Sequence, residues 1–223
     1  MLVQLTAKEH VINDIWAFWF EPQQPLHYIA GQYVELTVPH TPMDSRGDRR
    51  WLSIASAPHE GTPLLFTMRI PATCSSFKRA LMAVKPGSLL HISEPIGDFV
   101  LPRLTTVPGV LVAFGIGITP MRSMVCQAQH EQRGHLTSFH VATPTEYLFT
   151  DILDAIPHHK TPLSTTLGRI SHFTDHILTT VPSPAESMFY LSGPEPPVIA
   201  TMENLLAHGI NRQQIVLDYF PGY

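Results

Sequence analysis

The pattern of secondary structure expected from the sequence changes once along the chain, after about Arg103. Before that residue, short alternating or aromatic runs are separated by Gly and Pro, which indicates strands joined by turns. The candidate strands cover residues 15–20, 33–38, 64–70 and 89–93. One helix is expected from Ser76 to about Val84. Short strands at this spacing predict a closed barrel or a sandwich, and we expect an antiparallel β-barrel.

After Arg103, strands alternate with helices. Residues 110–114 form a continuous apolar run, which is typical of a strand covered on both faces of its sheet. Further strands are predicted at 136–142, 187–191 and 214–218, with helices at 120–132, 147–155, 171–179 and 195–208. This alternation predicts a parallel, doubly wound α/β sheet. The 223 residues accommodate two compact domains, so we predict domains of residues 1–103 and 104–223, with the linker in the stretch from Pro102 to Pro108.

The composition excludes several classes of protein. A formal net charge of −4 gives no support to nucleic-acid binding, which normally requires a basic surface. Cys74 and Cys126 are the two cysteines, too few for a disulfide-rich secreted fold or for a four-cysteine iron–sulfur cluster. The thirteen histidines form no metal-ligand pattern, so no metal site is predicted, and the pair His158-His159 is expected in a loop.

The sequence also shows no targeting or membrane signal. Residues 1–6 lack the basic region and apolar core of a signal peptide. No apolar run approaches the roughly 20 residues of a membrane span. We therefore expect a cytoplasmic protein with no membrane span.

The first segment with a chemical signature is Arg50-Trp51-Leu52-Ser53. An arginine at the start of a strand can hold a phosphate through two parallel hydrogen bonds. An apolar side chain such as Leu52 can cover a flat ring, and a hydroxyl such as that of Ser53 can reach the polar edge of the ring. The pattern suits a flavin nucleotide. A barrel strand with an exposed basic start is the alternative for this segment alone.

A second segment, Ala72-Thr73-Cys74-Ser75-Ser76, precedes the one helix expected in the first domain. Small hydroxyl residues at a helix N-terminus accompany free N–H groups and the positive end of the helix dipole, which suits a pyrophosphate. Plain capping by Ser75 or Ser76 is the alternative. Cys74 is expected to be a small filler. Together with Arg69 and Ile70 at the end of the preceding strand, residues Thr73 to Ser76 are candidate cofactor contacts.

A third segment, Gly115-Ile116-Gly117-Ile118-Thr119-Pro120, follows the buried strand at 110–114. Its glycines let the backbone approach a diphosphate closely. Thr119 can cap the following helix, with Pro120 at the first helical position. The turn differs from the three-glycine dinucleotide fingerprint because Pro120 occupies the third glycine position.

The fourth segment, Ser192-Gly193-Pro194, lies at the carboxyl end of another predicted strand. Ligands of open α/β sheets bind at such ends, so Gly117 and Gly193 are expected to line one crevice. An ordinary link between a strand and a helix is the alternative.

In this order, the four segments resemble those of the ferredoxin–NADP reductase family in its compact two-domain form, and the resemblance covers nearly all of the chain. It implies an FAD-binding barrel followed by an NAD(P)-binding α/β domain. By this resemblance, Arg50 would contact the flavin phosphates and Ser53 would approach the ring nitrogen that accepts hydride. Ser75 would bind the FAD pyrophosphate, and residues Gly115 to Pro120, Ile118 included, would receive NADH or NADPH.

The chain departs from the family pattern at three positions. Leu52 replaces a ring-stacking Tyr, Ala72 replaces a Gly, and Ser192 replaces a Cys that lies beside the nicotinamide together with Gly193 and Pro194. Trp51 is expected on the opposite side of its strand from Leu52. We interpret these differences as tuning of the site rather than as its loss.

The family often places a C-terminal aromatic residue on the flavin, and the resemblance therefore implies that Tyr219 or Phe220 gates hydride transfer. Closure of the sheet by this tail is the alternative. Residues 142–145 carry no arginine to select a 2′-phosphate, which favours NADH or weak discrimination, although Arg169 is a possible substitute. The expected acceptor is a small electron carrier such as ferredoxin or flavodoxin. A flavin-binding module or complex subunit without NAD(P)H turnover is the alternative function.

Overall fold

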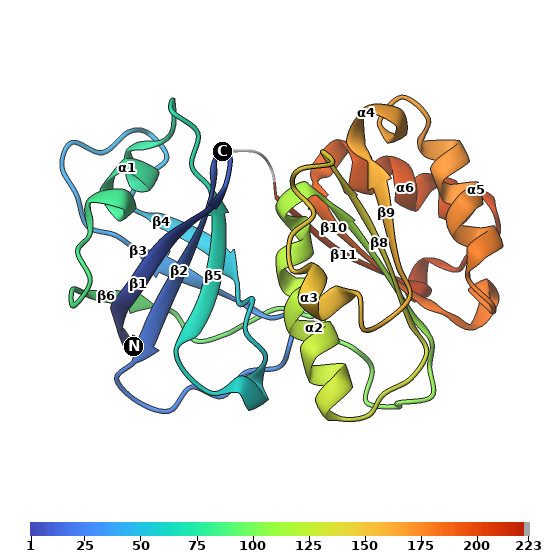
Figure 1. Cartoon of the computed structure of the whole chain (residues 1–223), viewed down its shortest axis with the longest axis horizontal. Helices are drawn as coiled ribbons and strands as arrows, with labels where there is room; N and C mark the ends of the chain where they lie inside the picture. The colour runs from blue at the N-terminus through green and yellow to red at the C-terminus, as the bar shows by residue number, and fades with distance from the viewer. Residues whose placement is uncertain (221–223) are drawn as a thin grey trace.

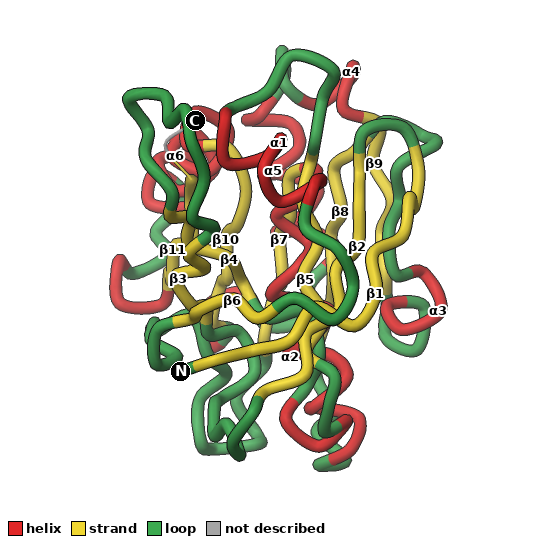
Figure 2. Tube along the Cα trace, turned by 90° about the vertical axis from the view of Figure 1, so that its left-hand side faces the viewer, coloured by secondary structure: helices red, strands yellow, loops and turns green. Residues whose placement is uncertain are grey.

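A computed structural model describes the backbone of residues 1–220 and the side chains of residues 1–219. It contains a six-stranded and a five-stranded sheet, one in each half of the chain (Figure 1). In Figure 2, where the two halves overlap, α3 and α6 lie toward opposite sides of the view. The predicted fold class, a β-barrel followed by a doubly wound α/β domain, is confirmed.

The first sheet is antiparallel and has the strand order β4-β3-β6-β1-β2-β5. Its strands are β1 (Leu2–Ile12), β2 (Ile15–Pro22), β3 (Tyr33–Thr37), β4 (Arg49–Ser53), β5 (Leu64–Arg69) and β6 (Leu89–Ile92). Helix α1 (Ser76–Ala83) follows β5. The sheet curls like a barrel without closing, since no ladder joins its edge strands β4 and β5 within the described residues. An open seam is left between these two strands.

The core of this domain is built from alternate residues of its strands. In β3, for example, Val34 and Leu36 are buried, while the residues that alternate with them, Tyr33, Glu35 and Thr37, are only partly buried. Phe20 and Phe66 meet edge to face with their ring centroids 5.8 Å apart. Phe77 of α1 is fully buried in the same core, so the helix is packed against the barrel by this face.

The second sheet is parallel throughout and has the order β11-β10-β7-β8-β9. Its strands are β7 (Gly109–Phe114), β8 (Leu136–Ala142), β9 (His158–Pro162), β10 (Met188–Pro194) and β11 (Ile215–Phe220). The α-helices are α2 (Ile118–His130), α3 (Thr150–Leu153), α4 (Leu163–Thr166), α5 (Ile170–Thr180) and α6 (Glu195–Ala207). The chain order reverses between β7 and β10, which is the position where sheets of this class bind ligands.

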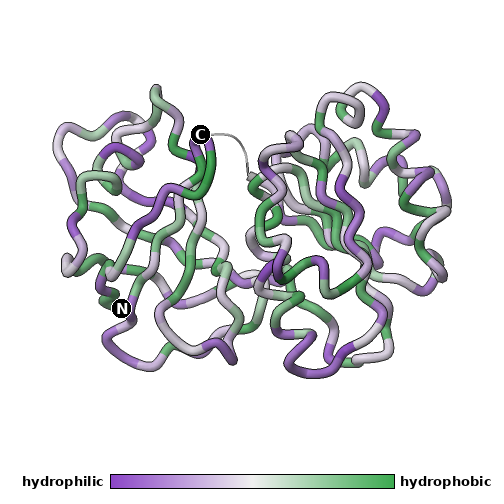
Figure 3. The backbone as a smooth tube through the Cα atoms, in the orientation of Figure 1, coloured by the Kyte–Doolittle hydropathy of each residue, from purple (hydrophilic) through white to green (hydrophobic). Residues whose placement is uncertain are grey.

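Helices cover both faces of this sheet. Helix α2 lies on the side of the first domain, and α5 and α6 lie on the far side (Figure 1). Every residue of β7 is buried, as its continuous apolar run predicts. In Figure 3 hydrophobic residues follow the central strands of the sheet, while the outer loops are largely hydrophilic.

The structure corrects several details of the predicted elements. The pair His158-His159 lies in strand β9 and not in a loop, because an edge strand needs only one well-packed neighbour and tolerates polar residues. Strand β1, which was not among the expected strands, has only Val3 and Leu5 buried. The helix expected over 147–155 is reduced to the single turn of α3, where Phe149 takes a left-handed backbone conformation.

The two domains meet along α2. Met121 and Met124 of this helix pack in one cluster with Phe99 and Ala30 of the first domain. Arg122 also forms an ion pair with Glu60 across the interface. In the described part of the chain, no helix combines the length and apolar character required to cross a membrane.

Candidate functional site

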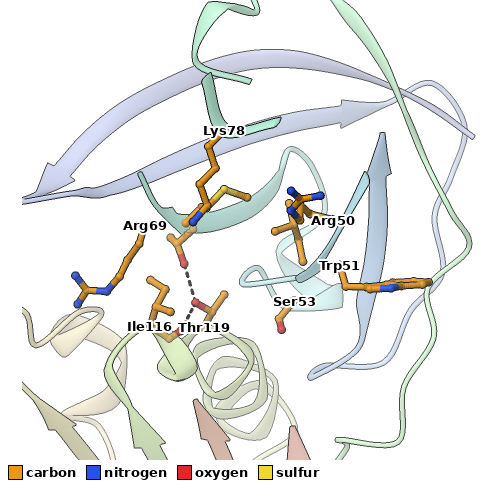
Figure 4. A pocket seen from close by; sticks show the side chains of 10 residues that line it. Arg50, Trp51, Ser53, Arg69, Lys78, Ile116 and Thr119 are labelled. Carbon is orange, nitrogen blue, oxygen red and sulfur yellow. Dashed lines mark hydrogen bonds between the residues drawn. The ribbon is translucent and has the colours of Figure 1, made fainter. Parts of the chain in front are cut away.

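A cavity of about 260 Å³ lies at the open seam of the first sheet, where the second domain approaches it (Figure 4). Strand β4 forms one side, β5 the other, and α1 and the start of α2 complete it. The lining residues are Arg50, Trp51, Leu52, Ser53, Thr67, Met68, Arg69, Lys78, Ile116 and Thr119. The absence of a β4–β5 ladder therefore creates the space for a ligand between the domains.

Arg50 and Ser53 of β4 supply a charged and a polar group to this cavity. The Arg50 side chain is only 4% exposed; its guanidinium lies over the Phe77 ring, 5.0 Å from the centroid, and donates to the Arg46 carbonyl at 2.8 Å. The Ser53 Oγ atom is buried and has no hydrogen-bond partner among the described residues. A buried hydroxyl of this kind normally has a partner, so the site fits a ligand with a polar edge at Ser53.

Trp51 and Leu52 extend on opposite sides of β4, as predicted from strand geometry. Leu52 packs against the barrel core. Trp51 points away from Ser53 in Figure 4 and meets Tyr33 edge to face at 5.3 Å between ring centroids. Leu52 is therefore placed to cover a flat ligand from the barrel side, and Trp51 borders the cavity at its outer rim.

Arg69 at the end of β5 connects the two domains. It forms ion pairs with Asp14 at 2.6 Å and with Glu146 of the second domain. Glu146 also accepts a hydrogen bond from the Asn13 side chain at 2.8 Å. The hydrogen bond from Arg69 lowers the pKa of the Glu146 carboxyl to about 2, so the pair is charged at neutral pH. The sequence does not reveal this connection, because its members lie far apart in the chain.

The glycine-rich turn reaches the cavity through Ile116 and Thr119. Residues 115–117 form a 3₁₀ turn, and α2 begins at Ile118. The expected capping role of Thr119 and the expected first position of Pro120 are therefore wrong, since both lie inside the first turn of the helix. Thr119 Oγ1 instead donates to the Ile116 carbonyl at 2.8 Å and lies 2.7 Å from Thr67 Oγ1 of the first domain.

Gly117 and Gly193 lie next to each other in the structure. A Cβ atom added to Gly117 would lie 2.4 Å from the Ser192 carbonyl oxygen and 2.6 Å from the Gly193 nitrogen. The ends of β7 and β10 approach each other too closely for any side chain at Gly117. Gly193 adopts a φ of +143°, and an added Cβ would lie 2.7 Å from the Phe114 carbonyl oxygen. The two glycines are thus required for different reasons: close approach at Gly117, and backbone conformation as well at Gly193.

His140 of β8 forms a hydrogen bond to the glycine-rich turn, a role that the sequence did not indicate. The residue is fully buried, and its Nε2 atom lies 3.0 Å from the Gly115 carbonyl oxygen. Because a carbonyl can only accept, Nε2 carries the hydrogen. Burial lowers the pKa of His140 to about 4, so the ring is neutral at physiological pH. His140 could have been found only from its place on β8, the strand that pairs with β7 before Gly115, and this pairing is known only once the sheet order is known.

Ser192 is fully buried at the end of β10, where its Oγ atom donates to the Asp218 carboxylate at 3.2 Å. Burial raises the pKa of Asp218 to about 6. Val216 to Tyr219 also line a second cavity of about 310 Å³, together with Tyr33 and residues 97–99 of the first domain. Tyr219 is 39% exposed. The Phe220 side chain lies outside the described residues.

The residues predicted between β5 and α1 do not line the cavity. Ile70 packs partly against the barrel core. Thr73 is exposed, and Cys74 is half-buried. Pro194, at the end of β10, is exposed and precedes α6.

Ser75 and Ser76 form the cap of α1. Ser75 Oγ accepts the Lys78 backbone N–H at 3.3 Å. The Ser76 N–H donates to the Asp44 carboxylate at 2.8 Å, and Ser76 Oγ accepts the Asp44 N–H at 2.9 Å. The capping alternative considered for this segment is therefore present in the structure.

Comparisons with known proteins show which proteins this chain resembles. No protein-family model matches the chain. Flavohemoprotein A of Dictyostelium discoideum is 32% identical over 123 residues, covering 50% of this chain and 31% of that protein. Among the flavohemoproteins of Dictyostelium discoideum, Bacillus subtilis and Oceanobacillus iheyensis, the chain spans 31%, 36% and 56% of the relative's length.

Solved structures match over almost the whole chain, among them one from Vibrio cholerae and one from Neisseria gonorrhoeae. The flavohem-like FAD/NAD-binding domain of nitric oxide dioxygenase from Vibrio cholerae superimposes with a TM-score of 0.78 at 18% identity, and 98% of each chain is covered. A ferredoxin NADP⁺ reductase from Neisseria gonorrhoeae superimposes with a TM-score of 0.77 at 19% identity, again over 98% of each chain. The chain has the ferredoxin–NADP reductase fold.

The resemblance predicted from the four segments is thus confirmed for the fold. Within the ferredoxin–NADP reductase fold of this chain, three of the four segments meet in space. Arg50 to Ser53 and Ile116 to Thr119 line one cavity, and Gly193 contacts Gly117 directly. The remaining segment, the second one, lies before α1 and is not among the residues that line the cavity, which Lys78 of that helix does line.

Proposed function

We propose that the chain is an FAD-dependent oxidoreductase that transfers hydride between NAD(P)H and bound FAD. One observation carries the proposal: the cavity at the open barrel seam, with Arg50 and Ser53 in its lining, is bounded on its other side by the glycine-rich turn through Ile116 and Thr119. A flavin site and a pyridine-nucleotide site therefore share one boundary, as hydride transfer requires. On this proposal residues 1–103 are the flavin domain and residues 104–223 the nucleotide domain.

The residues of the cavity suit the parts of a flavin nucleotide. The guanidinium of Arg50, held in place by Phe77 and the Arg46 carbonyl, would contact phosphate. The Ser53 hydroxyl would donate to the polar edge of the ring at its hydride-accepting nitrogen. Leu52 would cover the barrel-side face of the ring with an aliphatic group.

The nucleotide site would be formed by Gly115 to Pro120 and by Ser192 and Gly193. Bound FAD accepts a hydride and releases single electrons, and the protein supplies binding and orientation. Ser192, oriented by its bond to Asp218, would hold the nicotinamide amide or ring edge. Tyr219, on the neighbouring strand, would occupy the nicotinamide position until the nucleotide displaces it.

The names of similar proteins support this assignment. The Neisseria structure contains bound FAD and NADP, and the Vibrio structure is an FAD/NAD-binding domain. The ferredoxin reductase of carbazole 1,9a-dioxygenase also matches, with a TM-score of 0.82 at 21% identity. A one-electron carrier such as ferredoxin or flavodoxin is accordingly our proposed acceptor. Residues 142–145, at and after the end of β8, include no arginine that could select a 2′-phosphate, so we propose NADH or weak discrimination between the nucleotides.

A reductive titration tests the proposal. The protein, purified and loaded with FAD, is titrated anaerobically with NADH and with NADPH while the flavin absorption is recorded. Bleaching by at least one nucleotide is expected, with NADH as effective as NADPH or more so. A stably bound flavin that neither nucleotide bleaches would instead support a flavin-binding module, which Leu52 and Ser192 favour. Failure to bind flavin under any loading condition would contradict both functions.

A further inference from the structure

The positive charges around the cavity are not equivalent. Arg50, Arg69 and Lys78 all line it, but Arg69 is neutralised by its ion pairs with Asp14 and Glu146. Lys78 has no ion pair among the described residues. A cavity with an excess of cationic side chains favours an anionic ligand.

Two backbone N–H groups at the N-terminus of α1 are already bonded to side chains of the protein. Its Ser76 N–H donates to the Asp44 carboxylate, and its Lys78 N–H donates to Ser75 Oγ. Asp44 in turn is held by Arg46 at 2.9 Å, and these hydrogen bonds keep the pKa of the Asp44 carboxyl well below its usual range. A carboxylate of the chain itself thus occupies the helix end where a diphosphate was expected from the sequence.

Lys78 is placed to offer a further hydrogen-bond donor near these two N–H groups. It lies in the first turn of α1, next to the fully buried Phe77, and its side chain extends from the helix into the cavity between Arg69 and Arg50 (Figure 4). Burial lowers the pKa of the Lys78 ammonium and is the largest effect; Cys74 and Asp14 act to raise this pKa, and the cations Arg50 and Arg46 act to lower it. An ammonium in such surroundings is stabilised when an anion binds beside it.

We propose that Lys78 is a binding residue for the FAD diphosphate, and that together with Arg50 it adds positive charge to the cavity beside the partly occupied N-terminus of α1. The inference rests on the proposed flavin function and adds to it a contact outside the four segments that the sequence singled out. A lysine donates from a compact charge, so arginine at the same position is expected to substitute in part.

The test measures flavin affinity and does not depend on turnover. Wild type, Lys78→Met, Lys78→Arg and the control Lys85→Met are titrated with FAD and, separately, with riboflavin, which has the same ring and no phosphate. Binding is followed by the change in flavin fluorescence. Lys85 is exposed beyond the end of α1 and has no ion pair within the described part of the chain, so its variant removes one charge without touching the cavity.

We expect Lys78→Met to weaken FAD binding by roughly 10- to 100-fold, the usual effect of losing a hydrogen bond between charged groups. Riboflavin affinity should change less than about twofold, Lys78→Arg should retain most of the FAD affinity, and Lys85→Met should match wild type. Unchanged FAD binding by Lys78→Met would overturn the inference while leaving the flavin function intact. An equal loss for FAD and riboflavin would also overturn it, because it would indicate a structural role. A wild-type protein that binds neither flavin would overturn the proposed function itself.

Discussion

At the scale of single residues, Asp218 on β11 is a carboxylate whose pKa is shifted by its surroundings. Its carboxylate accepts one hydrogen bond, from Ser192, and burial raises its pKa to about 6 from the ordinary 3.8. The folded protein therefore holds this proton to a higher pH than the unfolded chain. Its contribution favours folding below pH 4 and is lost as the pH rises through 6.

Asp218→Asn should remove this pH dependence. The amide oxygen can still accept from Ser192 Oγ, and the side chain no longer ionises. We expect the variant to be more stable than wild type by about 1–3 kcal/mol at pH 8 and equally stable near pH 4. Urea unfolding at both pH values measures the difference. Asp98→Asn, at an exposed position of the same cavity, is the control. A stability difference that stays constant with pH would contradict the prediction.

At the scale of elements, the contact between the ends of β7 and β10 determines the shape of the nucleotide turn. Gly117 has an ordinary helical backbone conformation, with φ of −59°, so its conformation alone does not require glycine. The requirement comes from Ser192 and Gly193 of the neighbouring strand, which leave no room for a Cβ atom. The glycine motif thus serves strand-to-strand packing as well as approach to a ligand.

Gly117→Ala should therefore separate the two strand ends. We expect a loss of stability of about 1–3 kcal/mol, because backbone atoms and not a flexible side chain must move. NAD(P)H affinity should fall by at least about tenfold, since the turn would no longer fit the diphosphate. Thermal unfolding and nucleotide titration measure the two effects. The control is Gly134→Ala, where no atom lies within 4 Å of the added Cβ. Unchanged unfolding and affinity in Gly117→Ala would show that the turn can adapt.

At the scale of the whole molecule, both apolar and polar contacts hold the two domains together. Apolar side chains pack along α2. The hydroxyl pair Thr67–Thr119 and the ion pairs of Arg69 and Arg122 add polar contacts around the cavity. The relative position of the domains therefore depends in part on charge.

Glu146→Gln tests the electrostatic part of the domain contact. The low pKa of Glu146, about 2, means that its ion pair stabilises the protein above the ordinary carboxyl pKa of 4.5 and that this stability is lost as the pH falls toward 2. We expect the variant to be less stable than wild type by about 1–3 kcal/mol at pH 7 and by a smaller amount at pH 3. Urea midpoints at both pH values provide the measurement. Glu203→Gln, exposed on α6, is the matched control, and an equal deficit in Glu146→Gln at both pH values would argue against a role of its charge.

The sequence alone determined the two-domain architecture and the order of the ligand-facing segments. The apolar run of β7 and the break at Lys85-Pro86-Gly87 after α1 are consequences of residues close together in the chain. Periodicity and turn chemistry of this kind are local properties, so they can be predicted from neighbouring residues. The meeting of Gly117 with Gly193 also followed from the sequence, because the carboxyl ends of adjacent parallel strands share one edge.

Only the tertiary structure decided where charge is neutralised and where it is left for a ligand. The seam between β4 and β5 stays open, Asp44 caps the helix that was expected to bind a diphosphate, and Glu146 neutralises Arg69. The last two results depend on contacts between groups far apart in the chain, since 32 positions separate Asp44 from Ser76 and 77 separate Arg69 from Glu146. No local pattern records such a contact. Lys78 lines the cavity and has no ion pair among the described residues, which is why the structure, and not the motifs, identifies it as a site residue.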